Sequence, residues 1–271
     1  MRYAIGVILL ACVPLALPTR ASVPGGKSNT LTGGERTGNV YLQSRLQAGQ
    51  VLGNIFSRTI AFKAAGLEIA VRRTSGTGVY TVIQSSVDKL LFNGVFLYDG
   101  KPEAKAKTEI RDNGATICYD DKCAPSTDAS GLLYNPRIWG DPAGTIRKGA
   151  SWEVSISEPW ELGPPGKQTV TVISLDSANH SITLKREGKG EGFFADEKKQ
   201  IPVAKDGKTY TVDVVPGPSR WTGYTTFREG IVISDELLVE RSVSLVSAEL
   251  GTIPASQREY ILLNAMPLLS Q

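Results

Sequence analysis

From about residue 39 onward, the chain alternates apolar and polar residues with a period of two, as in Phe56, Ile60 and Phe62. Successive side chains of a strand point to opposite faces, so this alternation predicts half-buried strands. Further segments rich in Val, Ile, Thr and Tyr lie at 151–157, 168–175, 181–186, 208–215, 223–228 and 236–249. Together they predict a mainly antiparallel, all-β protein of roughly 11–14 strands. We expect a curved sheet, a sandwich or a half-open barrel.

Turn signals divide these segments. Asn93-Gly94 lies between apolar residues and predicts a two-residue hairpin, and residues 75–78 (Ser-Gly-Thr-Gly) predict another turn. Further turn signals are Asp99-Gly100, Asp112-Asn113-Gly114 and Asp206-Gly207. Helix is scarce, with one or two short candidates: residues 40–48, which also alternate like a strand, and residues 255–262 after Pro254.

One long segment, residues 124–149, is rich in Pro, Gly and Ser and interrupts the strand pattern. It is either a linker between two lobes, 39–125 and 150–255, or a loop laid over one sheet. The second interpretation is favoured by its apolar residues, which are Leu132, Leu133, Tyr134, Ile138 and Trp139. We expect a single β domain over 39–271, with two lobes as the alternative.

The N-terminus has the pattern of a secretory signal peptide. Arg2 precedes an apolar run over 4–17, Pro18 ends it, and Ala21 offers a cleavage site. We therefore expect residues 1–21 to be removed, residues 22–38 to form a Gly/Ser-rich spacer, and the protein to be periplasmic or secreted. In the alternative, Leu9-Leu10-Ala11-Cys12 resembles a bacterial lipobox, and Cys12 anchors a lipoprotein. No second apolar stretch approaches the length of a membrane span, so none is expected in the mature chain.

The charge balance of the chain argues against nucleic acid as a partner. The net charge is +3, but Arg2 and Arg20 belong to the predicted signal peptide. Without them, 28 basic residues face 27 acidic residues. A nearly neutral chain without long basic runs does not predict nucleic-acid binding.

Two cysteines remain after removal of Cys12. Cys118 and Cys123 are separated by four residues, which suits a pair facing across the end of a hairpin. An even pair in an exported protein predicts a structural disulfide.

Catalytic patterns are weak throughout the chain. The single histidine, His180, lies in a predicted turn, and a Ser-His-Asp triad needs a histidine held between an acid and a nucleophile. Residues 86–89 match S-x-x-K, but the S-D-N and K-T-G motifs that accompany it in β-lactamases are absent. Adjacent acids such as Asp120-Asp121 would point to opposite faces of a strand. We predict no catalytic residues, no metal site and no cofactor.

Aromatic residues on predicted Gly/Pro loops give the strongest positive signal. Tryptophan offers a large contact area at low entropic cost, so a loop tryptophan predicts either a recognition surface or a plug for the end of a β structure. The candidate ligand-binding residues are Trp139, Trp160, Trp221, Tyr224, Arg137 and Arg220.

These observations favour a non-catalytic protein of the bacterial periplasm or envelope. Its expected partner is a lipid or other amphiphile, or an envelope protein. One alternative is a carboxylate-dependent hydrolase of envelope polymers, which requires two acids converging in a cleft. Another is a structural or assembly module that pairs through exposed strand edges.

Overall fold

The computed structural model describes residues 42, 45–86, 89–99, 103–111, 114–119, 122–126, 134, 136–142, 146–160, 163–194 and 198–268. All of them belong to one compact unit, Thr37–Gln271. The predicted signal peptide, the spacer and Cys12 lie outside the described residues, as do residues 40, 41, 43 and 44 of the candidate helix at 40–48. The described residues of that candidate, 42 and 45–48, are turn or irregular and not helical.

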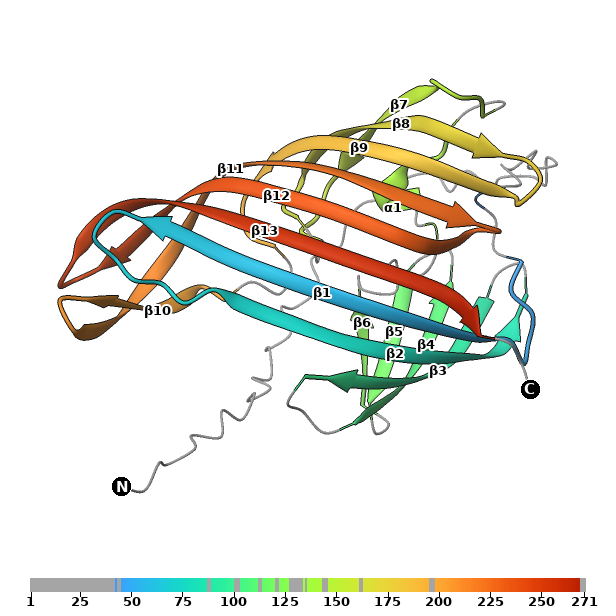
Figure 1. Ribbon diagram of the computed structural model, residues 1–271, viewed down its shortest axis with the longest axis horizontal. Coiled ribbons are helices and arrows are strands. Elements are labelled where there is room, and N and C mark those ends of the chain that lie inside the picture. Colours follow the sequence, from blue (N-terminus) through green and yellow to red (C-terminus); the bar gives the residue numbers. More distant parts are fainter. Residues whose placement is uncertain are drawn as a thin grey trace, which may run out of the picture. The chain divides into compact units, whose positions relative to one another are not determined.

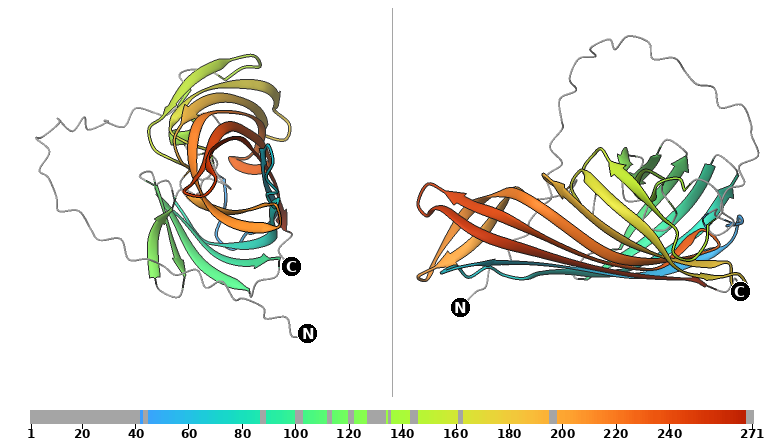
Figure 2. Two further views of the ribbon diagram at one scale, coloured as in Figure 1. Left: turned by 90° about the vertical axis from the view of Figure 1, so that its left-hand side faces the viewer. Right: turned by 90° about the horizontal axis from the view of Figure 1, so that it is seen from above.

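A single antiparallel sheet of 13 strands dominates the described residues (Figure 1). The strands are β1 (Val51–Ala64), β2 (Arg72–Ser85), β3 (Lys89–Tyr98), β4 (Ala104–Arg111), β5 (Gly114–Tyr119), β6 (Lys122–Ser126), β7 (Ser151–Ile156), β8 (Gly166–Asp176), β9 (Ser181–Glu191), β10 (Gln200–Lys205), β11 (Lys208–Arg228), β12 (Ile231–Ser247) and β13 (Gly251–Leu268). Their order is β6-β5-β4-β3-β2-β1-β13-β12-β11-β9-β8-β7, and β10 pairs with β11 beside this path. The sheet is curved and not closed, which confirms the predicted fold class (Figure 2).

The first and last long strands join the two parts of the sheet. β1 pairs with β13 from Val51 opposite Leu268 to Ala64 opposite Ala255. Strands from both predicted lobes, 39–125 and 150–255, therefore belong to the same hydrogen-bonded sheet.

The prediction of two separate strands at 208–215 and 223–228 is wrong. Both segments belong to β11, which runs through Pro216-Gly217-Pro218. The pairing of β11 with β12 shifts between Pro216 and Ser219, where Gly217 and Pro218 lie opposite the single residue Ser242 and form a bulge. A bulge accommodates proline inside a sheet because the ladder is locally interrupted there.

Two of the turn predictions are wrong. Asn93-Gly94 lies inside β3, and residues 75–78 lie inside β2. The glycines serve close packing instead, since a Cβ at Gly94 would lie 2.7 Å from Cζ of Phe96. Asp206-Gly207 does form the predicted tight turn, with φ values of 50° and 75° that suit a two-residue hairpin.

The predicted helix at 255–262 is also wrong, because these residues lie in β13. Gln257, Glu259 and Ile261 are buried at alternate positions while their neighbours are not. This is the period of a strand with one face in the core. The one helix among the described residues is α1 (Pro136–Trp139), and it is too short to cross a membrane.

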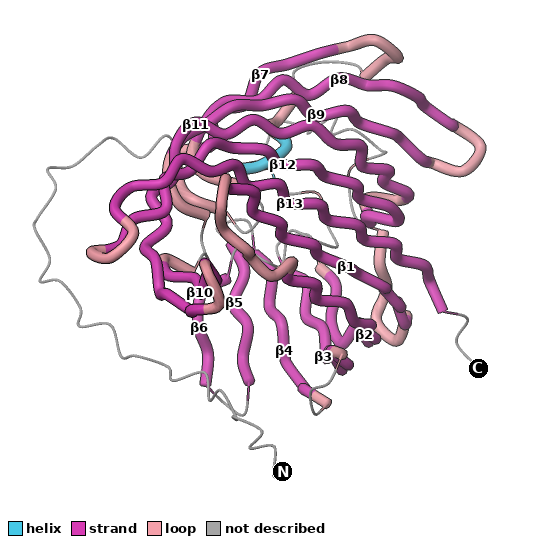
Figure 3. The backbone as a smooth tube through the Cα atoms, turned by 60° about the vertical axis from the view of Figure 1, so that its left-hand side comes forward, coloured by secondary structure: helices cyan, strands magenta, loops and turns pink. Residues whose placement is uncertain are grey.

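Helix α1 lies beside the inner face of the sheet (Figure 3). Ile138 and Trp139 are buried, and Tyr134 packs on the same cluster. The choice between a linker and a loop for the 124–149 segment stays a prediction. Leu132 and Leu133 lie outside the described residues.

Among the described residues, buried apolar side chains form three clusters on the face that we call the inner face. The largest, the tryptophan cluster, joins α1 to β7–β9, β11 and β12 and includes Trp139, Trp160, Trp221, Leu184, Phe227 and Leu237. A second cluster includes Leu52, Val82, Phe92 and Ile231. A third cluster joins β10, β11 and β12 and includes Val203, Val212 and Leu245. Burial of these side chains is the main stabilising contribution to the fold.

Candidate functional site

The three predicted loop tryptophans lie inside the protein. Trp139, Trp160 and Trp221 are 3–4% exposed and belong to the tryptophan cluster. The rings of Trp160 and Trp221 meet edge to face with centroids 6.0 Å apart. Trp221 is on strand β11 and Trp139 on helix α1, so the prediction that both lie on loops is wrong. Their packing is that of a plug, and a ligand-binding role for them stays a prediction.

A buried ion pair lies within the same cluster. One guanidinium nitrogen of Arg186 lies 2.7 and 2.8 Å from the two carboxylate oxygens of Asp235. The guanidinium carbon of Arg186 lies 4.7 Å from the ring centroid of Trp139 and 5.6 Å from that of Trp160. Thr225 donates a further hydrogen bond to Asp235. Charges are stable in such a core only when they are paired and hydrogen-bonded, so the assembly has a structural function.

Gln168 links Trp221 of β11 to the covering helix. Its side-chain oxygen accepts a hydrogen bond of 2.9 Å from Nε1 of Trp221, and its amide nitrogen donates to the carbonyl of Ile138. Nε1 of Trp152 donates to the carbonyl of Trp139 at 2.6 Å. The covering segment is thus fixed by hydrogen bonds as well as by apolar packing.

The other predicted ligand residues are not brought together with the tryptophans. Tyr224 is 46% exposed, and the side chain of Arg220 is 79% exposed. Their strand neighbours Trp221 and Thr225 are buried, so Tyr224 and Arg220 lie on the opposite, outer face of β11. Arg137 is exposed on α1.

A second group of aromatic side chains, which the sequence analysis missed, lines the inner face of β1–β3. We call Phe56, Tyr80, Phe96 and Tyr98 the aromatic patch. Ring centroids are 5.5 Å apart for Phe56 and Tyr98, and 5.3 Å apart for Tyr80 and Phe96, both in edge-to-face geometry. All four residues are only half-buried, whereas the tryptophans across the sheet are buried. The patch therefore offers accessible aromatic surface on the inner face.

Glycines form the floor of the aromatic patch. Gly76 faces Phe56 across β1 and β2, and Gly94 faces Tyr80 across β2 and β3. A Cβ would lie 2.9 Å from a ring carbon of Phe56 at Gly76, and 2.9 Å from one of Tyr80 at Gly78. Rings that cover glycine in this way pack close to the sheet. Aromatic residues opposite glycines are the sequence signal for this patch.

Polar groups border the aromatic patch within β1. Asn54 donates a hydrogen bond of 3.2 Å to the hydroxyl of Tyr80, and its buried side-chain oxygen has no partner among the described residues. On the other side of Phe56, Arg58 forms an ion pair with Glu259 of β13. The side chain of Arg58 is 28% exposed, whereas that of Glu259 is 1% exposed.

Burial raises the pKa of Glu259, and the positive charges of Arg58, Arg241 and Arg72 oppose this rise. Arg241 donates to the side-chain oxygen of Gln257 over 2.9 and 2.7 Å. Burial lowers the pKa of Arg241 to about 10. The patch thus ends at a region where several arginines surround one buried carboxyl group.

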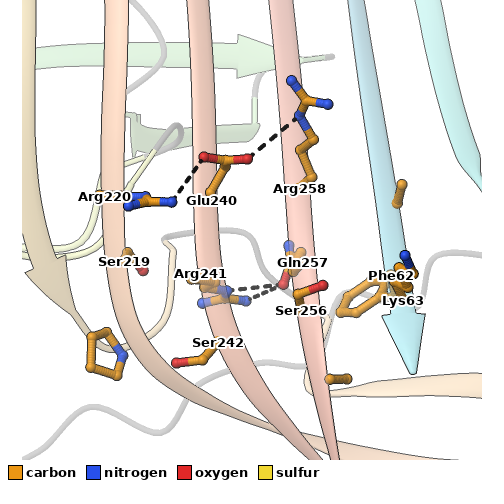
Figure 4. Close-up of a pocket in the computed structure, with 13 residues that line it drawn as sticks. Phe62, Lys63, Ser219, Arg220, Glu240, Arg241, Ser242, Ser256, Gln257 and Arg258 are labelled. Carbon is orange, nitrogen blue, oxygen red and sulfur yellow. Dashed lines mark hydrogen bonds and ion pairs between the residues drawn. The ribbon is translucent and has the colours of Figure 1, made fainter. Parts of the chain in front are cut away.

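A shallow groove of about 670 Å³ crosses β11, β12, β13 and β1 (Figure 4). Its lining includes the exposed residues Lys63, Arg220 and Arg258 and the half-buried Glu240. Glu240 lies 3.6 Å from Arg220 and 3.8 Å from Arg258, as the dashed lines in Figure 4 mark. The groove lies beside the Gly217–Pro218 bulge of β11, where a strand bends most readily.

The cysteine prediction is confirmed. Cys118 and Cys123 form a disulfide with a Cα–Cα distance of 4.0 Å and lie opposite each other on β5 and β6. His180 lies in the turn between β8 and β9, where its carbonyl accepts a hydrogen bond from Glu229. The described residues contain no cluster of three or more His, Cys, Asp or Glu residues with the geometry of a metal site.

No protein-family model matches the chain, and no curated protein matches it. Among solved structures, a lipovitellin described for its lipid–protein interactions is 11% identical with a TM-score of 0.39. That match covers 83% of this chain but only 26% of the lipovitellin chain. A DUF1329 family protein from Desulfovibrio piger is 8% identical with a TM-score of 0.23, over 80% of this chain and 84% of that protein. The outer membrane protein OprG from Pseudomonas aeruginosa is 8% identical with a TM-score of 0.21, over 84% of this chain and 99% of OprG. These scores are too low to establish a shared fold.

Proposed function

We propose that this protein is an exported, non-catalytic β protein that binds an amphiphile on the inner face of β1–β3. The observation that carries this proposal is the half-buried aromatic patch of Phe56, Tyr80, Phe96 and Tyr98. Small-molecule sites are concave, mostly apolar, and supplied with a few fixed polar groups. The inner face of a curved sheet offers that shape.

The surroundings of the patch favour an amphiphile over a purely apolar ligand. The rings provide an apolar surface, and Asn54 and Arg58 lie on either side of Phe56 along β1. The apolar part of a ligand would lie on the rings, while its polar group would reach Arg58. The exposed part of Arg58 and the positive charge of Arg72 favour a negatively charged group there.

Export is supported by two independent features. Residues 1–21 have the pattern of a signal peptide, and the Cys118–Cys123 disulfide suits an oxidising compartment. We therefore propose a periplasmic or secreted location, with lipidation at Cys12 as the alternative. Mass spectrometry of the mature N-terminus distinguishes cleavage after Ala21 from lipidated Cys12.

Titration with a fluorescent fatty acid tests the ligand site. Phe96→Ser removes a ring of the patch, and we expect it to weaken binding about tenfold, because most of the apolar area of one phenylalanine is lost. Leu97→Ser is the matched control, since Leu97 is the next residue of β3, is 52% exposed and faces the other side. We expect Leu97→Ser to change the affinity less than about twofold.

Circular dichroism of both variants verifies that they are folded. Equal weakening by Phe96→Ser and Leu97→Ser would contradict the site. Mass spectrometry of protein purified from its own host gives a second test, because we expect an amphiphile to be retained. Absence of any bound amphiphile, together with no binding of the fluorescent probe, would remove the proposal.

A further inference from the structure

Arg58 has hydrogen-bond donors that the protein itself does not use. Its Nε donates to one carboxylate oxygen of Glu259, whereas its two terminal nitrogens are accessible and have no partner among the described residues. Arg58 lies two residues from Phe56 on the same face of β1, so these nitrogens border the aromatic patch. Two adjacent guanidinium nitrogens match two oxygens of a single carboxylate, sulfonate or phosphate group.

Glu259 depends on Arg58 for a charge partner. The Glu259 side chain is 1% exposed, and its second oxygen is buried without a hydrogen-bond partner among the described residues. A buried carboxylate is stable only when it is paired and hydrogen-bonded. An ionised Glu259 therefore needs the positive charge of Arg58.

Two further arginines face Glu259, but neither is bonded to it. Arg241 of β12 donates from all three guanidinium nitrogens, to the side chain of Gln257 and to the carbonyl of Gly192. Arg72 of β2 is exposed and lies two strands from Glu259 in the same cross-strand row. Their charges act on Glu259 without replacing the contact that Arg58 makes.

An anion bound to Arg58 would compete with Glu259 for one positive charge. The guanidinium would then lie between two negative groups, and its charge neutralises only one of them. A nearby negative charge favours the protonated form of a carboxyl group, and burial of Glu259 acts in the same direction. Transfer of one proton from the solvent to Glu259 would leave Arg58 to pair with the bound anion.

We propose that Arg58 binds the acid group of an anionic amphiphile through its terminal nitrogens, and that Glu259 takes up one proton when this ligand binds. The preferred ligand is thus an amphiphile with an ionised acid group, and neutral amphiphiles of the same chain length bind more weakly. This inference rests on the proposed amphiphile site, because the apolar chain of the ligand lies on the aromatic patch.

Calorimetric titration with decyl sulfonate and with decanol tests this inference. The two probes share one apolar chain, and the sulfonate stays ionised throughout the titrations. The bound protein keeps the Glu259 proton to a higher pH than the free protein, so the affinity for the sulfonate should fall as pH rises between these two pKa values. We expect about tenfold weaker sulfonate binding at about pH 9 than at about pH 5, and no such change for decanol.

The proton itself can be counted in the unmodified protein. Titrations with the sulfonate in two buffers of different ionisation enthalpy should show uptake of up to one proton per bound ligand. Glu259→Gln should abolish both this uptake and the pH dependence, because the titrating group is gone. Glu240→Gln is the matched control, since it makes the same change of charge on the outer face of the sheet and should retain both.

Arg58→Gln tests recognition of the acid group. We expect it to weaken sulfonate binding about tenfold and to change decanol binding less than about twofold. Circular dichroism of each variant verifies that it is folded.

Sulfonate binding without proton uptake by the unmodified protein would overturn the proposal, as would a pH dependence that persists in Glu259→Gln. Equal affinities for sulfonate and decanol would overturn the role of Arg58. Failure of the amphiphile site itself would appear differently, because neither probe would then bind to the aromatic patch or respond to Phe96→Ser. Decanol binding that Phe96→Ser weakens, together with pH-independent sulfonate binding, would remove only this inference.

Discussion

The inner face of the sheet differs between its two parts. On β8, β9, β11 and β12 it is covered by α1 and packed with buried tryptophans around the Arg186–Asp235 pair. On β1–β3 it carries aromatic side chains that are only half-buried over a glycine floor. The same alternating pattern thus produces a filled core in one part and an accessible apolar surface in the other. The filled part supplies stability, and the accessible part is where we propose that the amphiphile binds.

The largest expected difference between the two parts concerns the buried charge pair. Asp235→Ala leaves Arg186 charged and unpaired inside the tryptophan cluster, and we expect it to lower the free energy of unfolding by about 3–5 kcal/mol. Phe96→Ala in the accessible part should cost less than about 2 kcal/mol, because its ring is only half-buried. Urea unfolding followed by circular dichroism measures both changes.

The double variant Arg186→Met/Asp235→Leu is the control for this comparison. Replacing both partners by apolar residues removes the unpaired charge, so we expect it to be more stable than Asp235→Ala alone. A cost for Asp235→Ala no larger than that for Phe96→Ala would contradict the distinction between a filled and an accessible part.

Glycine substitutions probe how tightly each part is packed. A Cβ at Gly188 would lie 2.2 Å from Cε2 of Trp221, which is buried in the filled part. We expect Gly188→Ala to cost about 1–3 kcal/mol by overpacking. At Gly94 the nearest atom is the far end of the half-buried Phe96 ring, which has room to move. Gly94→Ala should therefore cost less than about 1 kcal/mol.

Thermal and urea unfolding of the two glycine variants give the comparison directly. Gly94→Ala should also alter binding of the fluorescent fatty acid, because it displaces a ring of the aromatic patch. A larger loss of stability for Gly94→Ala than for Gly188→Ala would show that the aromatic patch is as tightly packed as the tryptophan cluster.

The smallest expected effect is a pH dependence at the border of the aromatic patch. The raised pKa of Glu259 means that the folded protein retains this proton at pH values where the unfolded chain has lost it. The free energy of unfolding should therefore fall as pH rises from the ordinary carboxyl value of 4.5 through the pKa of the folded state. One group contributes a slope of at most about 1.4 kcal/mol per pH unit.

Glu259→Gln should remove this part of the slope, as measured by urea unfolding over a series of pH values. Glu240→Gln changes the net charge equally and has a more exposed side chain, so it serves as the control. An unchanged slope in Glu259→Gln would show that other groups cause the pH dependence.

Several strands were predictable because their side chains alternate cleanly. Residues 151–157 and 236–249 were assigned close to the observed β7 and β12, and the hairpin at Asp206-Gly207 was correct. Asn93-Gly94 was misassigned because this pair favours a tight turn, whereas Gly94 here makes room beneath an aromatic ring. Which of these roles applies depends on the neighbouring strands, which a local pattern does not contain.

The candidate site was less predictable than the fold. Tryptophans near prolines and glycines were interpreted as loop residues, yet Trp221 continues a strand past a bulge and is buried. Phe56, Phe96 and Tyr98 come from strands whose register brings their rings together over glycines.

The sequence alone determined that the chain forms an antiparallel β structure and that Cys118 and Cys123 pair, because alternation and short spacing act locally. Only the tertiary structure decided which aromatic rings are buried, which glycines lie beneath rings and which charges line up. Those properties arise from register between distant strands. A shift of one residue in register would move every side chain of a strand to the other face.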